Sequence, residues 1–373
     1  MKKFAILGAL SLVSVAWVQP ALAQSAQEQI ARAVRPLPEE LQAGAEVYDY
    51  DGETGERIVL RKGSSHVECQ VPGEEFTWCY PTTTRARRDL SAKLRAEGTS
   101  GDELRAALAA ANLDPTPMGS MMYRLYEKDD RIQMLWVVVL PNATSEELGL
   151  STASQRDNAL AGKGLPWMMA EGTPGAHLMV PINARDLSNA GGAMTRLDTK
   201  AITDPVAQAV LPLPEDLRDG ATVVTYDKTT GARKVLRQGT NMIECQPRDP
   251  ESGFTRCYHK NNGAQNDLVA TLRAEGKSGE EIQAAVAAAR EAGTITPAPF
   301  GSVSYRLYEE NDRIKLLWVM RLPNAMPEDL GMSTGSQRDN ALAGEGFPWM
   351  MAEGTPGAHL MIPINATELS NPR

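Results

Sequence analysis

The chain has 373 residues, 23% of them charged, and a formal net charge of −9. Nucleic acid and anionic membrane surfaces attract basic proteins, so this acidic balance argues against both as partners. No stretch beyond the N-terminus approaches the roughly 20 apolar residues that a transmembrane helix needs, so we expect no stable membrane insertion of the mature chain.

The first 23 residues have the pattern of a secretory signal peptide. Two lysines precede an apolar run over residues 4–18, and Ala21-Leu22-Ala23 forms a small-x-small cleavage site before Gln24. The residue directly after this site is Gln24 and not a cysteine, which argues against a lipid anchor. We therefore expect an exported bacterial protein, either periplasmic or secreted.

The remainder is a tandem duplication. Residues 151–183 return at 333–365 with four of 33 positions changed, whereas residues 36–70 and 212–246 share only 20 of 35 positions. The closing stretch is therefore expected to hold what each copy needs most, with recent gene conversion as the alternative explanation. We assign repeat domain 1 to residues 24–187, a linker with a glycine-rich segment to 188–205, and repeat domain 2 to 206–373.

Both copies are predicted to contain the same elements in the same order. In the first copy these are a short helix before a proline hinge (27–34), a hairpin (45–50 and 57–61), a strand with the first cysteine (66–70), a helix (89–97), a second hairpin (121–126 and 132–140) and a closing strand (177–182). Gly98 followed by Ser100 and Glu103 indicates a helix end and a new capped start, and hence an αα-hairpin. We predict an α+β fold of two tandem homologous domains, each a mainly antiparallel sheet with one αα-hairpin.

The four cysteines fall as one pair in each copy. A duplicated unit that once folded alone pairs internally, so we expect the disulfides Cys69–Cys79 and Cys245–Cys257. A zinc site is the competing interpretation. It is disfavoured because only His259 lies beside a pair, and Pro81 takes its place in the first copy.

His177 and His359 are the histidines that occupy matching positions. On the closing strand, His177 and Met179 point to one face, and Leu178 and Val180 point to the other. The imidazole is therefore either structural, with a hydrogen bond to backbone, or part of a groove. In a groove it could form an acid–base or metal site with Glu171 and with Arg156 or Asp157.

A polar segment, Ser154 to Asn158, is identical at residues 336–340. It could cap a helix and fix a loop, or it could bind a polar ligand through the arginine fork. The candidate ligand-binding residues are Arg156, Asp157, Asn158, Trp167, Glu171 and His177 in the first copy, and Arg338, Asp339, Asn340, Trp349, Glu353 and His359 in the second.

The methionines around the matched histidines admit a copper interpretation, because thioether and imidazole ligands suit Cu(I). The residues concerned are Met168, His177, Met179, Met350, His359 and Met361. Methionine also fills irregular gaps in cores, and we favour this packing role. We accordingly expect no metal and no cofactor.

No catalytic signature supports an enzyme. The patterns H-E-x-x-H and G-x-G-x-x-G do not occur in the sequence, and G-x-S-x-G occurs at residues 331–335 without a counterpart in the first copy, where Ala153 replaces the last glycine. Ser154, Asp157 and His177 would form a triad only if folding brought them together. Catalytic residues are therefore not assigned.

The segment Leu60-Arg61-Lys62-Gly63 followed by a cysteine pair, and the closing PWMMAEGTPGAHLM, give the chain a resemblance. It resembles exported bacterial proteins that have a cysteine-paired segment and a closing strand with glycine or proline, histidine and methionine, here in doubled form. This resemblance implies export and a disulfide, and it implies no activity.

Two near-identical loop regions favour a two-site binding or interaction module of the cell envelope, since duplication raises the effective concentration of weak sites. The partner would be an envelope ligand or protein that the sequence does not identify. A hydrolase with a His/acid site in each repeat and a periplasmic Met/His copper-binding protein remain the alternatives.

Overall fold

The computed structural model describes residues 26–128, 130–183, 185–189, 191, 195, 197–310 and 312–371. The expected signal peptide, residues 1–23, lies outside the described residues. So do residues 190, 192–194 and 196 of the expected linker. Within the described residues, no helix is both long and apolar enough to cross a membrane.

The two repeats fold alike. The elements of the first are α1 (Ala26–Ala33), α2 (Glu39–Gln42), β1 (Glu46–Tyr50), β2 (Arg57–Arg61), β3 (Val67–Gln70), β4 (Phe76–Pro81), η1 (Thr82–Thr84), α3 (Arg85–Ala96), α4 (Gly101–Ala110), β5 (Met121–Tyr126), β6 (Met134–Val139), α5 (Ser145–Leu148), α6 (Arg156–Leu160), β7 (Trp167–Met169) and β8 (His177–Pro181). Those of the second are η2 (Thr199–Ala201), α7 (Pro205–Ala209), α8 (Glu215–Arg218), β9 (Thr222–Tyr226), β10 (Arg233–Arg237), β11 (Ile243–Gln246), β12 (Phe254–His259), η3 (Lys260–Asn262), α9 (Gly263–Ala274), α10 (Gly279–Glu291), β13 (Val303–Tyr308), β14 (Leu316–Arg321), α11 (Pro327–Leu330), α12 (Arg338–Leu342), β15 (Trp349–Met351) and β16 (His359–Pro363).

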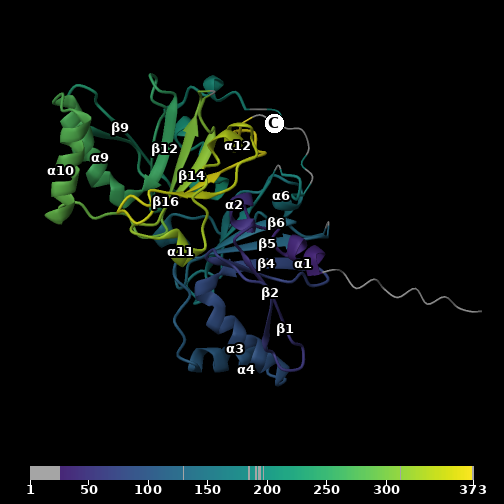
Figure 1. Cartoon of the computed structure of the whole chain (residues 1–373). Coiled ribbons are helices and arrows are strands. Elements are labelled where there is room, and N and C mark those ends of the chain that lie inside the picture. The colour runs from purple at the N-terminus through teal and green to yellow at the C-terminus, as the bar shows by residue number, and fades with distance from the viewer. Residues whose placement is uncertain are drawn as a thin grey trace, which may run out of the picture.

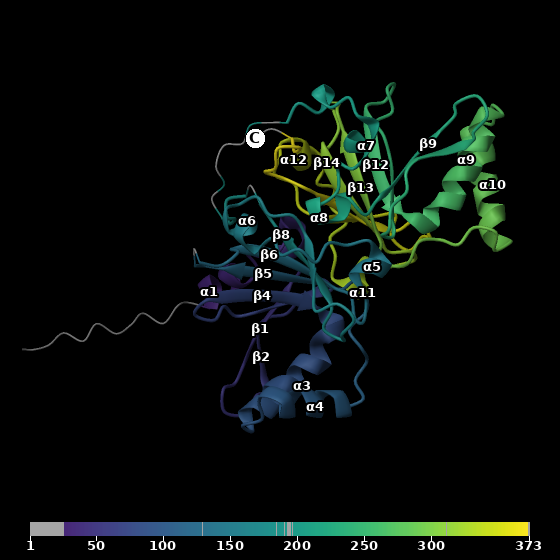
Figure 2. The same ribbon diagram turned by 180° about the vertical axis from the view of Figure 1, so that it is seen from behind.

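Each repeat forms one eight-stranded sheet, with the strand order β2-β1-β3-β4-β5-β6-β8-β7 in the first and β10-β9-β11-β12-β13-β14-β16-β15 in the second. The β1–β3 and β9–β11 pairs are parallel and the other pairs are antiparallel. The predicted α+β class with two similar, mainly antiparallel sheets is confirmed. The helical hairpins α3/α4 and α9/α10 lie at opposite ends of the molecule, and the sheets meet between them (Figures 1 and 2).

Both predicted disulfides are confirmed. Cys69 bonds Cys79, and Cys245 bonds Cys257. No strand was predicted around the second cysteine of each pair, but it lies on β4 or β12. The partners stand directly opposite each other on adjacent antiparallel strands, with Cα atoms 4.0 Å apart. Residues 76–81 alternate between more and less buried positions, which is the strand pattern that the sequence prediction overlooked.

The helical hairpins form where they were predicted, although the two differ at the start of their second helix. In α10, Ser278 and Glu281 form the expected capping box. In α4, the side chain of Ser100 makes no capping hydrogen bond, so only the glycine stop and the serine position are shared. The first helix, α3, begins at Arg85 rather than at Asp89.

The two sheets share one hydrophobic core. The buried cluster includes Trp136 and Trp318, and the Trp136 ring stacks on Phe347 of the other repeat with centroids 5.1 Å apart. Reciprocal hydrogen bonds cross between the repeats: the Tyr123 hydroxyl donates to the Gly331 carbonyl, and the Tyr305 hydroxyl donates to the Gly149 carbonyl. Such exchanged contacts are the mark of an isologous interface, in which the same surface is used on both sides.

Candidate anion-binding cleft

The near-identical closing stretches contribute to the contact between the repeats. The first residue of each reaches the other repeat: the Ser151 hydroxyl donates to Asp216 of α8, and the Ser333 hydroxyl donates to Glu40 of α2. A small cavity is lined by the ends of both closing strands, β8 and β16. Because an isologous contact places the same residues on both sides, this packing gives a physical reason for their near-identity.

The polar segments before β7 and β15 mainly hold local structure. Arg156 donates to the carbonyl of Asp130 at 3.2 Å, and Arg338 donates to that of Asp312 at 2.8 Å, so each arginine supports the turn before the central strand. Asn158 donates to Gln155, and Asn340 donates to Gln337 in the same way. The carboxylates of Asp157 and Asp339 are almost fully exposed.

Glu171 and Glu353 have different surroundings although their stretches match. The Ser145 backbone N–H at the start of α5 donates to Glu171 at 2.8 Å, and hydrogen bonding to Ser145 lowers the pKa of this carboxyl. The residue that corresponds to Ser145 is Pro327, which has no backbone N–H to donate. Glu171 therefore supports a helix start that Glu353 cannot support in the same way.

His177 and His359 are half-buried, and each places Nδ1 2.7 Å from a backbone carbonyl, that of Gly175 or Gly357. A carbonyl can only accept, so Nδ1 is the donor in both rings. The expected backbone hydrogen bond is therefore present. The accepting carbonyl belongs to the loop before the strand. Within the described residues, neither imidazole is hydrogen-bonded to a carboxylate, as the histidine of a catalytic triad would be.

The methionines considered as alternative copper ligands do not converge on the histidines. Met168 and Met350 belong to the large core between the sheets. Met179 packs with Trp167 on the opposite face of its sheet, and Met361 packs with Trp349 likewise. Both tryptophans are buried core residues. Within the described chain, no group of three or more His, Cys, Asp or Glu is placed to hold a metal ion.

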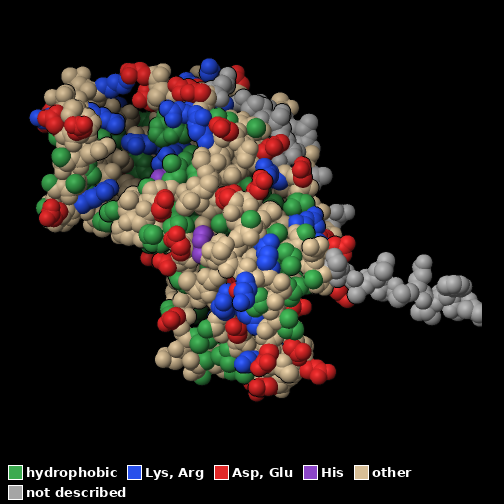
Figure 3. Space-filling view, viewed as in Figure 1, with side chains coloured by type: hydrophobic (Ala, Val, Ile, Leu, Met, Phe, Trp, Pro, Cys, Tyr) green, Lys and Arg blue, Asp and Glu red, His purple; other side chains and the backbone are tan. Residues whose placement is uncertain are grey.

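A cleft lies on the outer face of the second sheet, beneath the hairpin α9/α10, and we call it the basic cleft. Its three adjoining parts have volumes of about 180, 650 and 350 Å³. Figure 3 shows the hollow with Lys and Arg side chains around it. Its cationic lining residues are Arg256, Arg273, Lys277, Arg290, Arg306 and Arg321, and none of the residues that line it is Asp or Glu.

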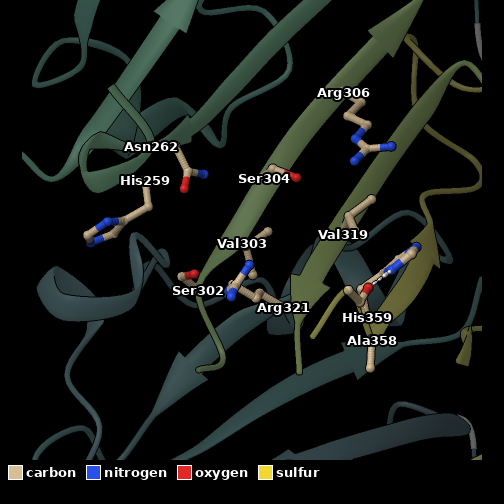
Figure 4. Close-up of a pocket in the computed structure, with 11 residues that line it drawn as sticks. His259, Asn262, Ser302, Val303, Ser304, Arg306, Val319, Arg321, Ala358 and His359 are labelled. Atoms are coloured by element: carbon tan, nitrogen blue, oxygen red, sulfur yellow. Dashed lines mark hydrogen bonds between the residues drawn. The ribbon is translucent and has the colours of Figure 1, made fainter. Parts of the chain in front are cut away.

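The strand register explains how these charges come together. Arg256 of β12 stands directly opposite Arg306 of β13, and Arg321 of β14 stands opposite His359 of β16. Figure 4 shows the end of the cleft where Ser304, Arg306, Val319, Arg321 and His359 lie on these neighbouring strands. Like charges directly opposite each other on adjacent strands destabilise a sheet, so the Arg256–Arg306 pair costs folding energy unless an anion compensates it.

No carboxylate neutralises the cleft arginines within the described residues. Arg256 donates to the neutral amide of Gln246, and Arg290 donates to that of Gln265. Nε of Arg321 is buried without a hydrogen-bond partner. Burial lowers the pKa of the Arg256 guanidinium, and the positive charges of Arg273 and Arg306 act in the same direction.

The pKa of Arg321 is shifted in the same direction as that of Arg256. Burial lowers the pKa of its guanidinium, and the nearby charge of Arg290 adds to this effect. Both guanidinium groups nevertheless remain charged at neutral pH, since arginine does not deprotonate in proteins. The cleft is thus a concave, partly buried cluster of arginines that have no carboxylate partner among the described residues, whereas Lys277 at its edge pairs with Glu281.

The corresponding face of the first repeat is filled by side chains. Trp78 replaces Arg256, and Arg124, the counterpart of Arg306, lies with its guanidinium 4.9 Å from the Trp78 ring centroid. Arg88, which corresponds to Asn266, packs over Tyr80 and forms an ion pair with the buried Glu68. Val139 replaces Arg321.

Sequence reasoning missed this cleft because it looked for identity between the repeats. Of the residues proposed from the sequence, only His359 lines it. The available signal was the opposite one: arginines at 256 and 321 where the first copy has Trp78 and Val139, on an otherwise acidic chain. Strand alternation would have placed Arg256 on the face that Cys257 does not use.

Comparison of the chain with protein-family models, with curated proteins and with solved structures gave no match.

Proposed function

We propose that this chain is an exported binding protein and that the basic cleft of its second repeat binds an anionic ligand. The observation that supports this most directly is the Arg256–Arg306 pair, which lies across two strands with no carboxylate to neutralise it among the described residues. A bound carboxylate or phosphate would compensate both guanidinium groups through charge-assisted hydrogen bonds.

The proposed cellular location is supported by the N-terminal sequence pattern together with the disulfides. Lysines, an apolar run and the Ala21-Leu22-Ala23 motif are features of export, and structural disulfides persist in oxidising compartments. We place the protein in the periplasm or outside a bacterial cell, with an envelope ligand. A two-site module would require an equivalent cleft in the first repeat, where Trp78 and Arg88 occupy the corresponding positions.

Calorimetric titration of the chain from Gln24 onward with citrate and with inorganic phosphate, at low salt, tests the proposal. We expect one anion site per chain and an affinity that falls as salt is added. Arg256→Trp, which installs the residue of the first repeat, should abolish binding. Trp78→Phe, at the matched position, should leave binding unchanged. Two equivalent sites per chain would favour the two-site module, and failure of both anions to bind would overturn the proposal.

A further inference from the structure

The cleft is longer than one anionic group requires. Its parts share lining residues: Asn262, Ser304 and Arg306 border two of them, and Arg256 and Asn266 border the next pair. Arg256 and His359 are three inter-strand steps apart and are also displaced by four residues along the strands, so their backbones are more than about 14 Å apart. Hydrogen bonds reach only about 3 Å, so a single carboxylate cannot serve both ends.

The positive charges fall into two groups. Arg256, Arg273 and Arg290 line the part of about 650 Å³ at one end, and Arg306 and Arg321 line the part of about 180 Å³ at the other. A ligand that compensates both groups carries at least two separated anionic groups.

Neutral polar and aromatic residues lie among these charges. Asn266 is 9% exposed, and its Nδ2 is buried without a hydrogen-bond partner on the cleft wall. Gln265 and Ser304 are further neutral polar groups there, and the stacked rings of Phe254 and Tyr308 form part of the lining. An inorganic polyphosphate can only accept hydrogen bonds, whereas the hydroxyls of a sugar chain can accept from an amide N–H and can also donate to the amide and hydroxyl oxygens of this lining.

We propose that the ligand of the basic cleft is a linear oligosaccharide with carboxylate groups, held at the two arginine groups by its carboxylates and between them by its hydroxyls. This inference rests on the proposed anion-binding function. Joining charged units in one chain makes binding of the second unit intramolecular, so affinity should rise with chain length until both groups are occupied.

The test is calorimetry on the chain from Gln24 onward with galacturonate, its linear di-, tri- and tetramers, and inorganic tripolyphosphate. We expect the tetramer to bind at least tenfold more tightly than the monomer and more tightly than tripolyphosphate. Equal affinity for monomer and tetramer would overturn the extended ligand, and tighter binding of tripolyphosphate would overturn the sugar class; in both cases anion binding itself stands. Failure of every anion to bind would overturn the proposed function as well.

Variants locate the two groups. Arg321→Val, the residue of the first repeat, should reduce tetramer affinity at least tenfold and so lower the ratio of tetramer to monomer affinity. Arg273→Gln should weaken the tetramer similarly. Arg95→Gln, at the position in the first repeat that corresponds to Arg273 and equally exposed, is the matched control and should change nothing. An unaltered length dependence in Arg321→Val would contradict the assignment of the two groups.

Discussion

The two repeats have the same fold, but the arginines on the outer faces of their sheets differ in whether carboxylates neutralise them. In the first repeat, Arg57, Arg85 and Arg88 all pair with Glu68, whose side chain is fully buried. In the second repeat, Gly263 and Asn266 replace Arg85 and Arg88, and Glu244 is bonded by Arg233 and by the Tyr258 hydroxyl. The first repeat therefore uses its arginines to hold a helix on a sheet.

In the second repeat, the arginines that line the basic cleft have no carboxylate partner among the described residues. Smaller residues at 266 and 304 leave the cleft unfilled, and Arg256 adds a charge where the first repeat has the Trp78 ring. Duplication permits this difference between the repeats. One copy can keep a well-packed, stable sheet face, while the other loses some packing and gains a binding site. Costly local arrangements of this kind are typical of functional sites.

The largest expected effect on stability belongs to the filled face. Arg88→Ala should lower the free energy of unfolding by about 3 kcal/mol, because it removes an ion pair from the buried Glu68 and a hydrogen bond from the Tyr48 hydroxyl. Asn266→Ala at the matched position should cost less than about 1 kcal/mol, since Nδ2 of Asn266 has no partner to lose. Urea denaturation measures both, and equal losses would contradict the comparison.

Replacing the matched arginines Arg306 and Arg124 should change the free energy of unfolding by a smaller amount, with opposite signs in the two repeats. Arg306→Gln should stabilise the ligand-free protein by about 0.5 kcal/mol, because it removes the charge opposite Arg256. Arg124→Gln should destabilise it by about 0.5–1 kcal/mol, because it removes the cation–π contact with Trp78.

Thermal unfolding at low salt resolves these two changes. Repeating it in about 0.5 M salt is the control, since screening should shrink the gain in Arg306→Gln. A destabilised Arg306→Gln variant would show that Arg306 has a structural role, and would weaken the case for the cleft.

Much of the fold could be predicted from the sequence, because local patterns determine it. Strand alternation, glycine stops and cysteine spacing each reflect the chain's immediate neighbourhood. The continuous apolar run of β6, residues 134–139, is typical of a strand buried on both faces, and both faces of β6 are covered. The sequence did not indicate that one face of β6 is buried against the other repeat. A strand face buried against a second domain has the same apolar pattern as one buried within its own domain.

The candidate site was harder to predict for a physical reason. A cleft arises where side chains are too small to fill a space and where counter-charges are missing, and no motif marks either condition. Identity between the repeats pointed instead to residues such as Ser151 and Ser333, which hold the repeats together. Divergence, as at Trp78 and Arg256, was the informative signal.

The smallest expected effect concerns Glu171 and Glu353, which have the same sequence neighbours. Glu171→Ala should lower the free energy of unfolding by about 0.5 kcal/mol at neutral pH, because its carboxylate accepts from the Ser145 N–H at the start of α5. The hydrogen bond lowers the pKa of Glu171 below 4.5. The contribution is therefore fully present above about pH 4.5, and it is lost as the pH falls through the lower folded pKa. Glu353→Ala should have no such pH-dependent effect, since Pro327 offers no N–H. Denaturation of both variants at about pH 7 and about pH 3 measures the difference, and a pH-independent loss in Glu171→Ala would show that packing rather than charge is responsible.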